Sequence, residues 1–401
     1  MNQNSEMFTN LGIGENILKV LTQLNFVTPT PIQHKAIPVA IEGKDVVGIA
    51  QTGTGKSLAF GIPLLQRLMA NQKGRGLVIL PTRELALQIN ETLQKIGRPF
   101  GLKTSVLIGG ASMYPQVNSI RQNPHIYIGT PGRINDHLKR KTLNLSNVSI
   151  LVLDEADCML DMGFAPQIKQ ILLSLPKERQ TMLFSATMPD AIIKIATTYM
   201  KLPVRVEIAR PGTANEKVEH ELFFIKKENK GVLLEKLLEE YKGSVLVFCR
   251  TKFAATKICR NLNAKGFTAA EIHSNRSLGQ RRMALDGFKM GKFRVLVATD
   301  IASRGIDVKG IELVINYDLP EGAGDYVHRI GRTGRAGLTG RAISFVQPDQ
   351  KSKVREIERL IRSTIPISQL PELPSPPIMS YNKPHEPHKF RRFQKSRYSH
   401  R

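Results

Sequence analysis

Short apolar runs alternate with amphipathic stretches along most of the chain. In the first half, the apolar runs predict strands at 45–50, 77–80, 105–108, 126–128, 150–153 and 181–184. Stretches with apolar positions three and four residues apart, such as 83–96 and 165–175, predict helices between those strands. This alternation is typical of an α/β fold, in which helices cover both faces of a mostly parallel sheet.

The same alternation restarts after a polar interruption at 209–215, where a Pro-Gly pair indicates a linker. Strands are predicted at 222–225, 245–248, 269–272, 295–298, 313–316 and 342–346, and helices at 230–241, 252–265, 280–290 and 350–361. From residue 366, seven prolines interrupt any periodicity. We therefore predict an N-terminal segment (1–34), an α/β domain (35–207), a linker (208–216), a second α/β domain (217–365) and a disordered basic tail (366–401).

Composition narrows the class of protein. The chain has 401 residues, of which 41% are hydrophobic and 23% charged, as in ordinary globular proteins. Its three cysteines lack a C-x-x-C pair, which excludes a disulfide framework or zinc ribbon and favours buried thiols. The sequence has neither a signal-peptide pattern nor an apolar run near the ~18 residues of a membrane span, so we expect a soluble, cytoplasmic protein.

Charge gives the first indication of a partner. The formal net charge is +24, and the basic excess is spread along the chain and is densest in the tail. Phosphates attract lysine and arginine, so a nucleic acid is the natural partner. A basic surface that only maintains solubility is the other interpretation.

A glycine-rich segment, Ala50-Gln-Thr-Gly-Thr-Gly-Lys-Ser57, lies between a predicted strand and a predicted helix. In that context its backbone N–H groups can surround phosphate oxygens, Lys56 can reach the β- and γ-phosphates, and the Ser57 hydroxyl can bind Mg²⁺. The alternative is a turn that merely joins strand to helix. The predicted nucleotide-binding residues of this loop are Gln51, Thr52, Gly53, Thr54, Gly55, Lys56 and Ser57.

A second apolar strand, at 150–153, ends in Asp154-Glu155-Ala156-Asp157. The carboxyl ends of parallel strands meet at one edge of a sheet, so these acids are expected beside the phosphate loop. Asp154 suits Mg²⁺, partly through water, and Glu155 suits polarising the attacking water. Together the two segments predict a nucleoside triphosphatase site.

Further short motifs lie on both sides of these two segments. They are Thr28-Pro-Thr-Pro-Ile-Gln33 with the aromatics Phe26 and Phe8, Pro81-Thr-Arg-Glu-Leu85, Gly109-Gly110, Thr130-Pro-Gly-Arg133, Ser185-Ala-Thr187, Val247-Phe-Cys-Arg-Thr251, Ala298-Thr-Asp-Ile-Ala-Ser-Arg-Gly-Ile-Asp307 and His328-Arg-Ile-Gly-Arg-Thr-Gly-Arg335. With the acidic tetrapeptide at 154–157, they resemble, over roughly residues 6–365, the Q motif and motifs Ia to VI of the DEAD-box RNA helicases.

The resemblance implies two tandem RecA-like domains, ATP and Mg²⁺ as ligands, and RNA-stimulated ATP hydrolysis. It implies nucleotide contacts from Phe8, Phe26, Thr28, Gln33, Gly305 and Asp307, and catalytic roles for Ser185, Thr187 and His328. His328 is expected to couple to the acidic strand end across the cleft. The Gln33 amide has the donors and acceptor to read N6 and N7 of adenine. Arg332 and Arg335, three apart on a predicted helix, can both point at one γ-phosphate from the opposite domain.

RNA contacts are implied for Pro81, Thr82, Arg83, Gly110, Thr130, Gly132, Arg133, Arg250 and Thr299. Small residues, hydroxyls and guanidinium groups suit phosphates and sugars, so binding is expected to be largely independent of sequence. For each threonine, a helix N-cap is an equally good interpretation. In the tail, lysine and arginine alternate with tyrosine and phenylalanine, which favours flexible RNA binding over a solubilising role.

Three positions depart from the family pattern. Asn25 replaces a usual glycine, Ser303 a usual alanine, and Leu278 a frequent glutamine, which puts one polar contact of the second domain in doubt. The minimal layout resembles the bacterial RhlE-type subgroup. The predicted function is ATP-dependent unwinding of short RNA duplexes or remodelling of RNA–protein complexes, with ribosomal or RNA-degradation proteins as candidate partners. An ATP-gated RNA clamp and a DNA translocase are the alternatives.

Overall fold

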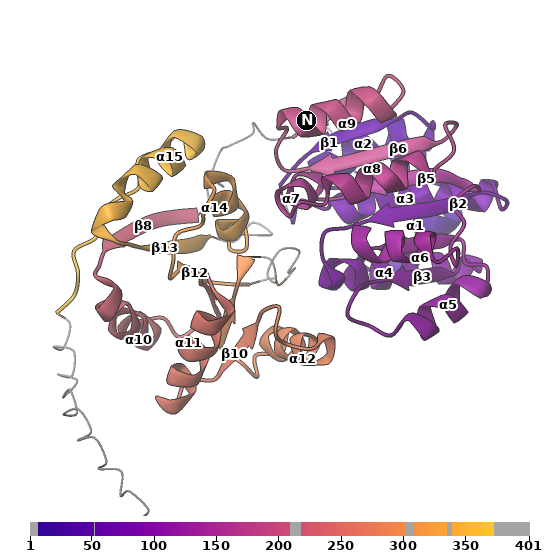
Figure 1. The fold of residues 1–401 in the computed structure, drawn as a ribbon. Coiled ribbons are helices and arrows are strands. Elements are labelled where there is room, and N and C mark those ends of the chain that lie inside the picture. Colours follow the sequence, from indigo (N-terminus) through magenta and orange to yellow (C-terminus); the bar gives the residue numbers. More distant parts are fainter. Residues whose placement is uncertain are drawn as a thin grey trace, which may run out of the picture.

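The structure, a computed structural model, describes residues 7–51, 53–208, 218–300, 308, 310–334 and 339–372. These residues form two α/β domains, drawn as the two lobes of Figure 1. Domain 1 comprises residues 7–208 and domain 2 residues 218–372. Each domain is built on one parallel sheet, as the alternation of apolar runs and helices predicts.

The described strands of domain 1 form a seven-stranded sheet in the order β3-β4-β2-β5-β6-β1-β7. Its strands are β1 (Val46–Ile49), β2 (Arg75–Ile79), β3 (Thr104–Leu107), β4 (Ile126–Gly129), β5 (Val148–Leu153), β6 (Gln180–Ser185) and β7 (Val204–Glu207). Its helices are α1 (Glu15–Gln23), α2 (Pro31–Ile41), α3 (Lys56–Ala70), α4 (Arg83–Gly97), α5 (Met113–Arg121), α6 (Pro131–Lys139), α7 (Ala156–Asp161), α8 (Ala165–Leu173) and α9 (Asp190–Tyr199).

Each central strand of domain 1 contributes to two apolar clusters. Val46 lies in a cluster with α1 to α4, whereas its neighbour Val47 lies in a cluster with α6 to α9. Successive side chains of a strand point to opposite faces, so a strand covered on both faces must be apolar throughout. This is why the strands appear in the sequence as continuous apolar runs.

Domain 2 repeats this architecture with a six-stranded sheet in the order β10-β11-β9-β12-β13-β8. Its described strands are β8 (Val218–Phe224), β9 (Val245–Phe248), β10 (Ala269–Ile272), β11 (Val295–Ala298), β12 (Leu313–Asn316) and β13 (Gly340–Val346). Its described helices are α10 (Lys230–Glu240), α11 (Lys252–Ala264), α12 (Leu278–Lys289), α14 (Ala323–Ile330) and α15 (Lys351–Ile361).

Strand β7 and the start of the C-terminal tail differ from the sequence-based expectation. Strand β7 was not predicted, because this short edge strand buries only Val206. The tail does not begin at residue 366: Leu222 N donates to Pro366 O at 3.0 Å, and Ser368 N donates to Leu222 O at 2.9 Å, so residues 366–368 lie beside β8. A proline retains its carbonyl acceptor, which is what this pairing uses. Residues 373–401 and residues 209–217, which include most of the predicted linker, lie outside the described part of the chain.

The three cysteines are buried free thiols, as predicted. Among the described residues, no helix is both long and apolar enough to cross a membrane.

Candidate active site and RNA interface

The predicted site residues of domain 1 follow the carboxyl ends of its parallel strands, which lie at one edge of the sheet. The strand order divides them into two groups. The strands β3, β4 and β2 are adjacent and lead into the motifs assigned to RNA, whereas β5, β6 and β1 are adjacent and lead into the motifs assigned to the nucleotide. One sheet edge therefore carries both sites side by side, in agreement with the rule that α/β sheets bind ligands there.

The phosphate loop joins β1 to α3. Gly53 and Gly55 have φ values of +86° and +94°, in the left-handed region that favours glycine. Lys56 is the first residue of α3 and only 5% exposed, and among the described residues its Nζ has no hydrogen-bond partner. A buried ammonium with unused donors is costly, so this arrangement is suited to an anion. Ser57 is half-buried in the next position, Thr54 Oγ1 donates to Gln51 O at 2.7 Å, and Thr52 lies outside the described residues.

The Q-motif residue Gln33 contacts this loop directly. Its Nε2 donates to Gly55 O at 2.9 Å, and its Oε1 accepts from Thr30 N at 2.9 Å. The Gln33 amide keeps a second N–H and a second lone pair, so these groups can still contact adenine while Gln33 bridges the loop. Sequence reasoning had missed the bridge, because the two segments are 22 residues apart.

The other Q-motif residues differ in exposure. Phe26 is 39% exposed and Thr28 is exposed, so both are accessible to a ligand. Phe8 is 4% exposed and packs in the apolar core of domain 1, which makes its contacts in this structure those of a core residue. Asn25 has φ +61°, and asparagine is among the residues that tolerate this conformation best after glycine. This explains why asparagine can replace the usual glycine here.

The acidic residues that follow β5 face the phosphate loop. Asp154 is 3% exposed, and its Oδ1 lies 3.9 Å from Lys56 Nζ. Burial raises the pKa of Asp154 to about 6, although Lys56 opposes that rise. Glu155 has φ +50° and ψ +50°, a left-handed conformation that is rare for a glutamate. Strained backbone of this kind occurs often at functional sites, which agrees with the role predicted for Glu155.

Asp157 is the functional residue to which the motif pattern had assigned no separate role. Its Oδ2 accepts from Thr187 N (2.8 Å), Thr187 Oγ1 (2.8 Å) and Ala186 N (3.1 Å), while Asp157 N donates to Ser185 Oγ at 3.3 Å. The same Oδ2 lies 3.8 Å from His328 Nε2 of domain 2. Burial acts to raise the pKa of Asp157, but His328, Lys56 and the Thr187 hydroxyl outweigh it and hold that pKa below its usual value. One carboxylate thus connects β6 to domain 2.

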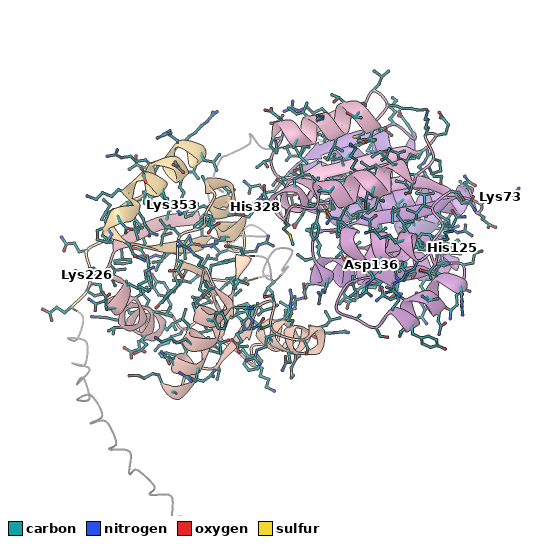
Figure 2. All side chains as sticks on the ribbon, in the orientation of Figure 1. Lys73, His125, Asp136, Lys226, His328 and Lys353 are labelled. Carbon is teal, nitrogen blue, oxygen red and sulfur yellow. The ribbon has the colours of Figure 1, made fainter. Side chains whose placement is uncertain are left out.

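The last turn of α14 carries His328, the domain 2 residue that lies opposite Asp157. His328 lies on the side of domain 2 that faces domain 1 (Figure 2). The expectation that Arg332 continues this helix is wrong, because α14 ends at Ile330 and Arg332 lies in the turn that follows. Arg332 is 2% exposed, and its Nε donates to His328 O at 3.2 Å. Gly305, Asp307 and Arg335 lie outside the described residues, so their predicted roles stay predictions.

The part of the sheet edge assigned to RNA contains two arginines that pack closely against the backbone of residues 110 and 111. Gly110 has φ +72°, and a Cβ there would lie 1.8 Å from Arg83 Nη1, so only glycine permits this approach. Arg133 Nη1 donates to Ala111 O at 3.0 Å. Burial, aided by the nearby Arg83 and opposed by Asp136, lowers the pKa of Arg133. These clustered guanidinium groups create a positive region suited to phosphates.

The threonines and neighbouring residues of this half have distinct environments. Thr82 is the N-cap of α4, and its hydroxyl accepts from Leu85 N at 3.3 Å, so the capping interpretation holds for this threonine. Thr130 precedes α6 without a side-chain cap hydrogen bond. Pro81 is buried and Gly132 half-buried. In domain 2, Arg250 is exposed after β9, and Thr299 is half-buried after β11.

The fold and the site define an enzyme that uses a nucleoside triphosphate bound at a phosphate loop. The DEAD/DEAH box helicase family profile matches residues 30–195, and the helicase conserved C-terminal domain profile matches residues 229–337. The ATP-dependent RNA helicase CshA of Listeria monocytogenes is 44% identical over 369 residues, which cover 91% of this chain and 70% of that protein. The chain therefore belongs to the DEAD-box family of ATP-dependent RNA helicases.

Solved structures of similar proteins include the following two, each of which covers 91% of this chain. Dbp5 of S. cerevisiae bound to RNA and ADP BeF3 is 29% identical, is 96% covered and superposes with a TM-score of 0.82. A DEAD box protein of Methanococcus jannaschii is 39% identical and 99% covered, but its TM-score is 0.54. The match to Dbp5 over most of both chains supports the tandem RecA-like fold of this chain.

The chain is thus an ATP-hydrolysing RNA helicase, and RNA is its partner. The predicted fold class, enzyme class and use of ATP are confirmed. The RhlE-type subgroup and the roles of individual site residues stay predictions.

Proposed function

We propose that this helicase opens short RNA duplexes locally, or remodels RNA–protein complexes, by closing its two domains around ATP and RNA. The proposal rests on the contacts of Asp157. Its Oδ2 accepts hydrogen bonds from Thr187 of motif III and lies close to His328 of domain 2. A single buried carboxylate can transmit the state of the nucleotide half of domain 1 to domain 2. Hydrolysis then resets the closed arrangement.

At the nucleotide, the residues of this chain have separate tasks. Lys56, with its unused buried donors, binds the phosphates, and the second N–H and lone pair of Gln33 read adenine while Phe26 stacks on the base. Glu155 orients and deprotonates the attacking water. Mg²⁺ fits beside these residues, because the Ser57 hydroxyl and the buried Asp154 carboxylate are hard oxygen ligands; when bound, it would neutralise phosphate charge.

Domain 2 completes the site from the opposite side. Arg332 and Arg335 supply positive charge to the transferred phosphate in the transition state, a contribution of roughly 10³–10⁵ in rate for arginine fingers. Arg332 fills that role from the turn after α14, where its side-chain Nε donates to the backbone carbonyl of His328. Ser185 and Thr187 act as positioning residues, because the contacts they make are with Asp157.

RNA lies across the other half of the same edge. Arg83 and Arg133 bind phosphates there, and Gly110, Gly132 and Thr130 allow close approach of the backbone. Such contacts do not read bases, so binding is largely sequence-independent. The three free thiols and the RNA partner favour action in the cytoplasm, with ribosomal or RNA-degradation proteins as partners.

A strand-displacement assay on a short RNA duplex tests this proposal. We expect ATP-dependent release of one strand by the wild type, and loss of release in Asp157→Asn with the nucleotide still bound. An RNA clamp would instead hold RNA in the presence of ATP and release no strand. ATP hydrolysis should also be compared with RNA and with DNA as the stimulant. Stimulation by RNA alone excludes a DNA translocase.

A further inference from the structure

Helix α12 of domain 2 presents one face to α4 of domain 1. Leu278, Arg281 and Arg282 occupy positions i, i+3 and i+4, which share a face of a helix. Leu278 is half-buried and packs against the apolar cluster of domain 1 that contains α4. Arg281 Nη2 donates to Glu84 Oε2 at 2.8 Å, and Arg282 Nη2 lies 3.8 Å from Glu91 Oε1. This face joins the domains at a place separate from Asp157 and His328.

The two ion pairs orient this contact but stabilise it little. The Arg282–Glu91 pair is more than half exposed on both sides, where solvent screens it. The Arg281–Glu84 pair is buried, but Arg281 Nε and Glu84 Oε1 have no hydrogen-bond partner among the described residues. Desolvation of an incompletely paired ion pair offsets most of its attraction. The favourable free energy of the contact between α12 and domain 1 must therefore come from burial of the apolar side chain of Leu278.

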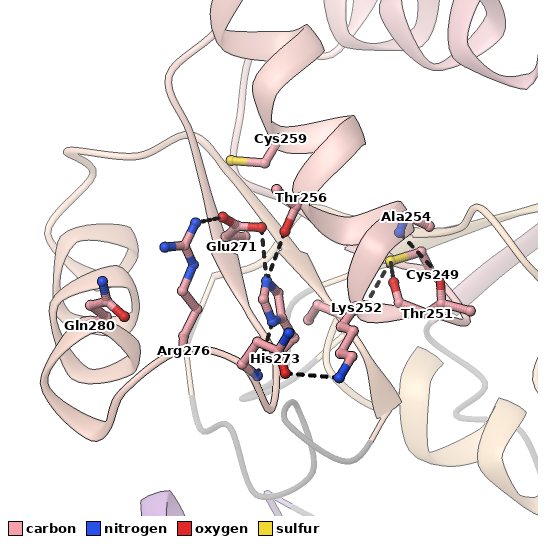
Figure 3. A network of polar contacts seen from close by, with 12 residues as sticks. Cys249, Thr251, Lys252, Ala254, Thr256, Cys259, Glu271, His273, Arg276 and Gln280 are labelled. Atoms are coloured by element: carbon pink, nitrogen blue, oxygen red, sulfur yellow. Dashed lines mark hydrogen bonds and ion pairs between the residues drawn. The ribbon is translucent and has the colours of Figure 1, made fainter. Parts of the chain in front are cut away.

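The loop that leads into α12 is held rigidly, so the position of Leu278 is fixed. His273 Nε2 lies 2.9 Å from Glu271 Oε2 and 3.1 Å from Thr256 Oγ1, and Arg276 donates to the other oxygen of Glu271 (Figure 3). Because Asn275 N donates to His273 Nδ1 at 3.3 Å, Nδ1 is an acceptor and the Nε2 proton points to these oxygens.

The first turn of α12 is fixed as well. The Ser277 hydroxyl accepts from Gln280 N at 3.3 Å, and Gln280 Oε1 accepts from Ser277 N at 3.0 Å, which is a capping box. Leu278 is the residue that follows this cap. Its side chain is therefore presented to domain 1 by a helix start that is already ordered.

We propose that Leu278 is a positioning residue that docks α12 onto domain 1 and so lowers the RNA concentration needed to close the helicase. Glu84, at the far side of this contact, directly follows the RNA-motif residue Arg83, so docking of α12 and RNA binding stabilise the same arrangement.

The test is Leu278→Gln in the full-length protein, with Leu278→Met as the conservative variant. Met283→Gln is the matched control, because Met283 is on the same helix but 62% exposed. RNA-stimulated ATPase rates over a range of single-stranded RNA concentrations give the half-stimulating concentration and kcat separately. Förster transfer between dyes at the exposed positions Gln122 and Arg260, one in each domain, reports closure.

We expect Leu278→Gln to raise the half-stimulating RNA concentration roughly 3- to 10-fold, the change that half-burial of a leucine implies. Its kcat at saturating ATP and RNA stays within about twofold, because the closed state itself is unaltered. Transfer efficiency at low RNA should fall, and Leu278→Met and Met283→Gln should match the wild type. Equal shifts in Leu278→Gln and Met283→Gln, or a fall in kcat alone, would overturn the proposal.

Discussion

The substitution Gly55→Ala isolates the contact between the Q motif and the phosphate loop. A Cβ at this position would lie 2.4 Å from Gln33 Nε2 and 2.7 Å from Thr30 Oγ1, so the Gln33 side chain must move. Its hydrogen bonds to Gly55 O and Thr30 N are then lost, at a cost of about 1–3 kcal/mol for buried polar groups left unpaired. The alanine also adopts a left-handed φ of +94°, which costs about 1–2 kcal/mol.

Gly101→Ala provides the matched control. Gly101 has φ +73°, but no atom lies within 4 Å of its added Cβ, so this variant has the backbone strain alone. Equilibrium titration with a fluorescent ATP analogue and Mg²⁺ measures the effect. We expect Gly101→Ala to bind like the wild type and Gly55→Ala to bind roughly 5- to 150-fold more weakly, the equivalent of about 1–3 kcal/mol. Equal affinities for the two variants would refute the coupling between Gln33 and the loop.

Three further outcomes are expected. Glu155→Gln keeps the side-chain size but removes its charge, so single-turnover hydrolysis should fall at least ~10²-fold while ATP and RNA still bind; an unchanged rate removes Glu155 from the mechanism. Asp157→Asn places a donor where Oδ2 accepts from Thr187 and faces His328, so the ratio of ATPase rates with and without RNA should fall about tenfold or more, and a preserved ratio contradicts the coupling. Deleting residues 379–401 should leave the ATPase rate at saturating RNA intact. It should reduce the slope of log RNA affinity against log salt concentration by roughly 1.4–2.8, which is about 0.7 for each of two to four lost phosphate contacts. An unchanged slope would indicate a solubilising tail.

Local pattern was sufficient to locate most of the secondary structure. Strands covered on both faces are continuous apolar runs, so β1 to β6 and β8 to β13 were recognisable, and the glycines of the phosphate loop indicated its backbone. Strand β7 was missed because an edge strand with one buried side chain has little apolar signal. The end of α14 was missed because the spacing of Arg332 and Arg335 fits a helix, but Gly331 ends it.

Most of the residue types at the site could also be predicted from the sequence. Most motifs directly follow a strand or begin a helix, and motif VI starts in the last turn of α14, so the residue types and order of each motif are local properties of the chain. A parallel sheet then brings the carboxyl ends of those strands to one edge, which is why Lys56 and Asp154 could be expected together.

What only the tertiary structure decided are the contacts between residues distant in the sequence. Gln33 reaches Gly55, Leu278 reaches the core of domain 1, and Asp157 is the acid at the strand end that lies close to His328. None of these pairings has a periodicity or a spacing, because each depends on how separately folded elements pack. Burial likewise emerged only in the folded chain: it makes the unused hydrogen-bond donors of Lys56 costly and raises the pKa of Asp154. The sequence determined which groups this helicase has, and packing determined which of them act together.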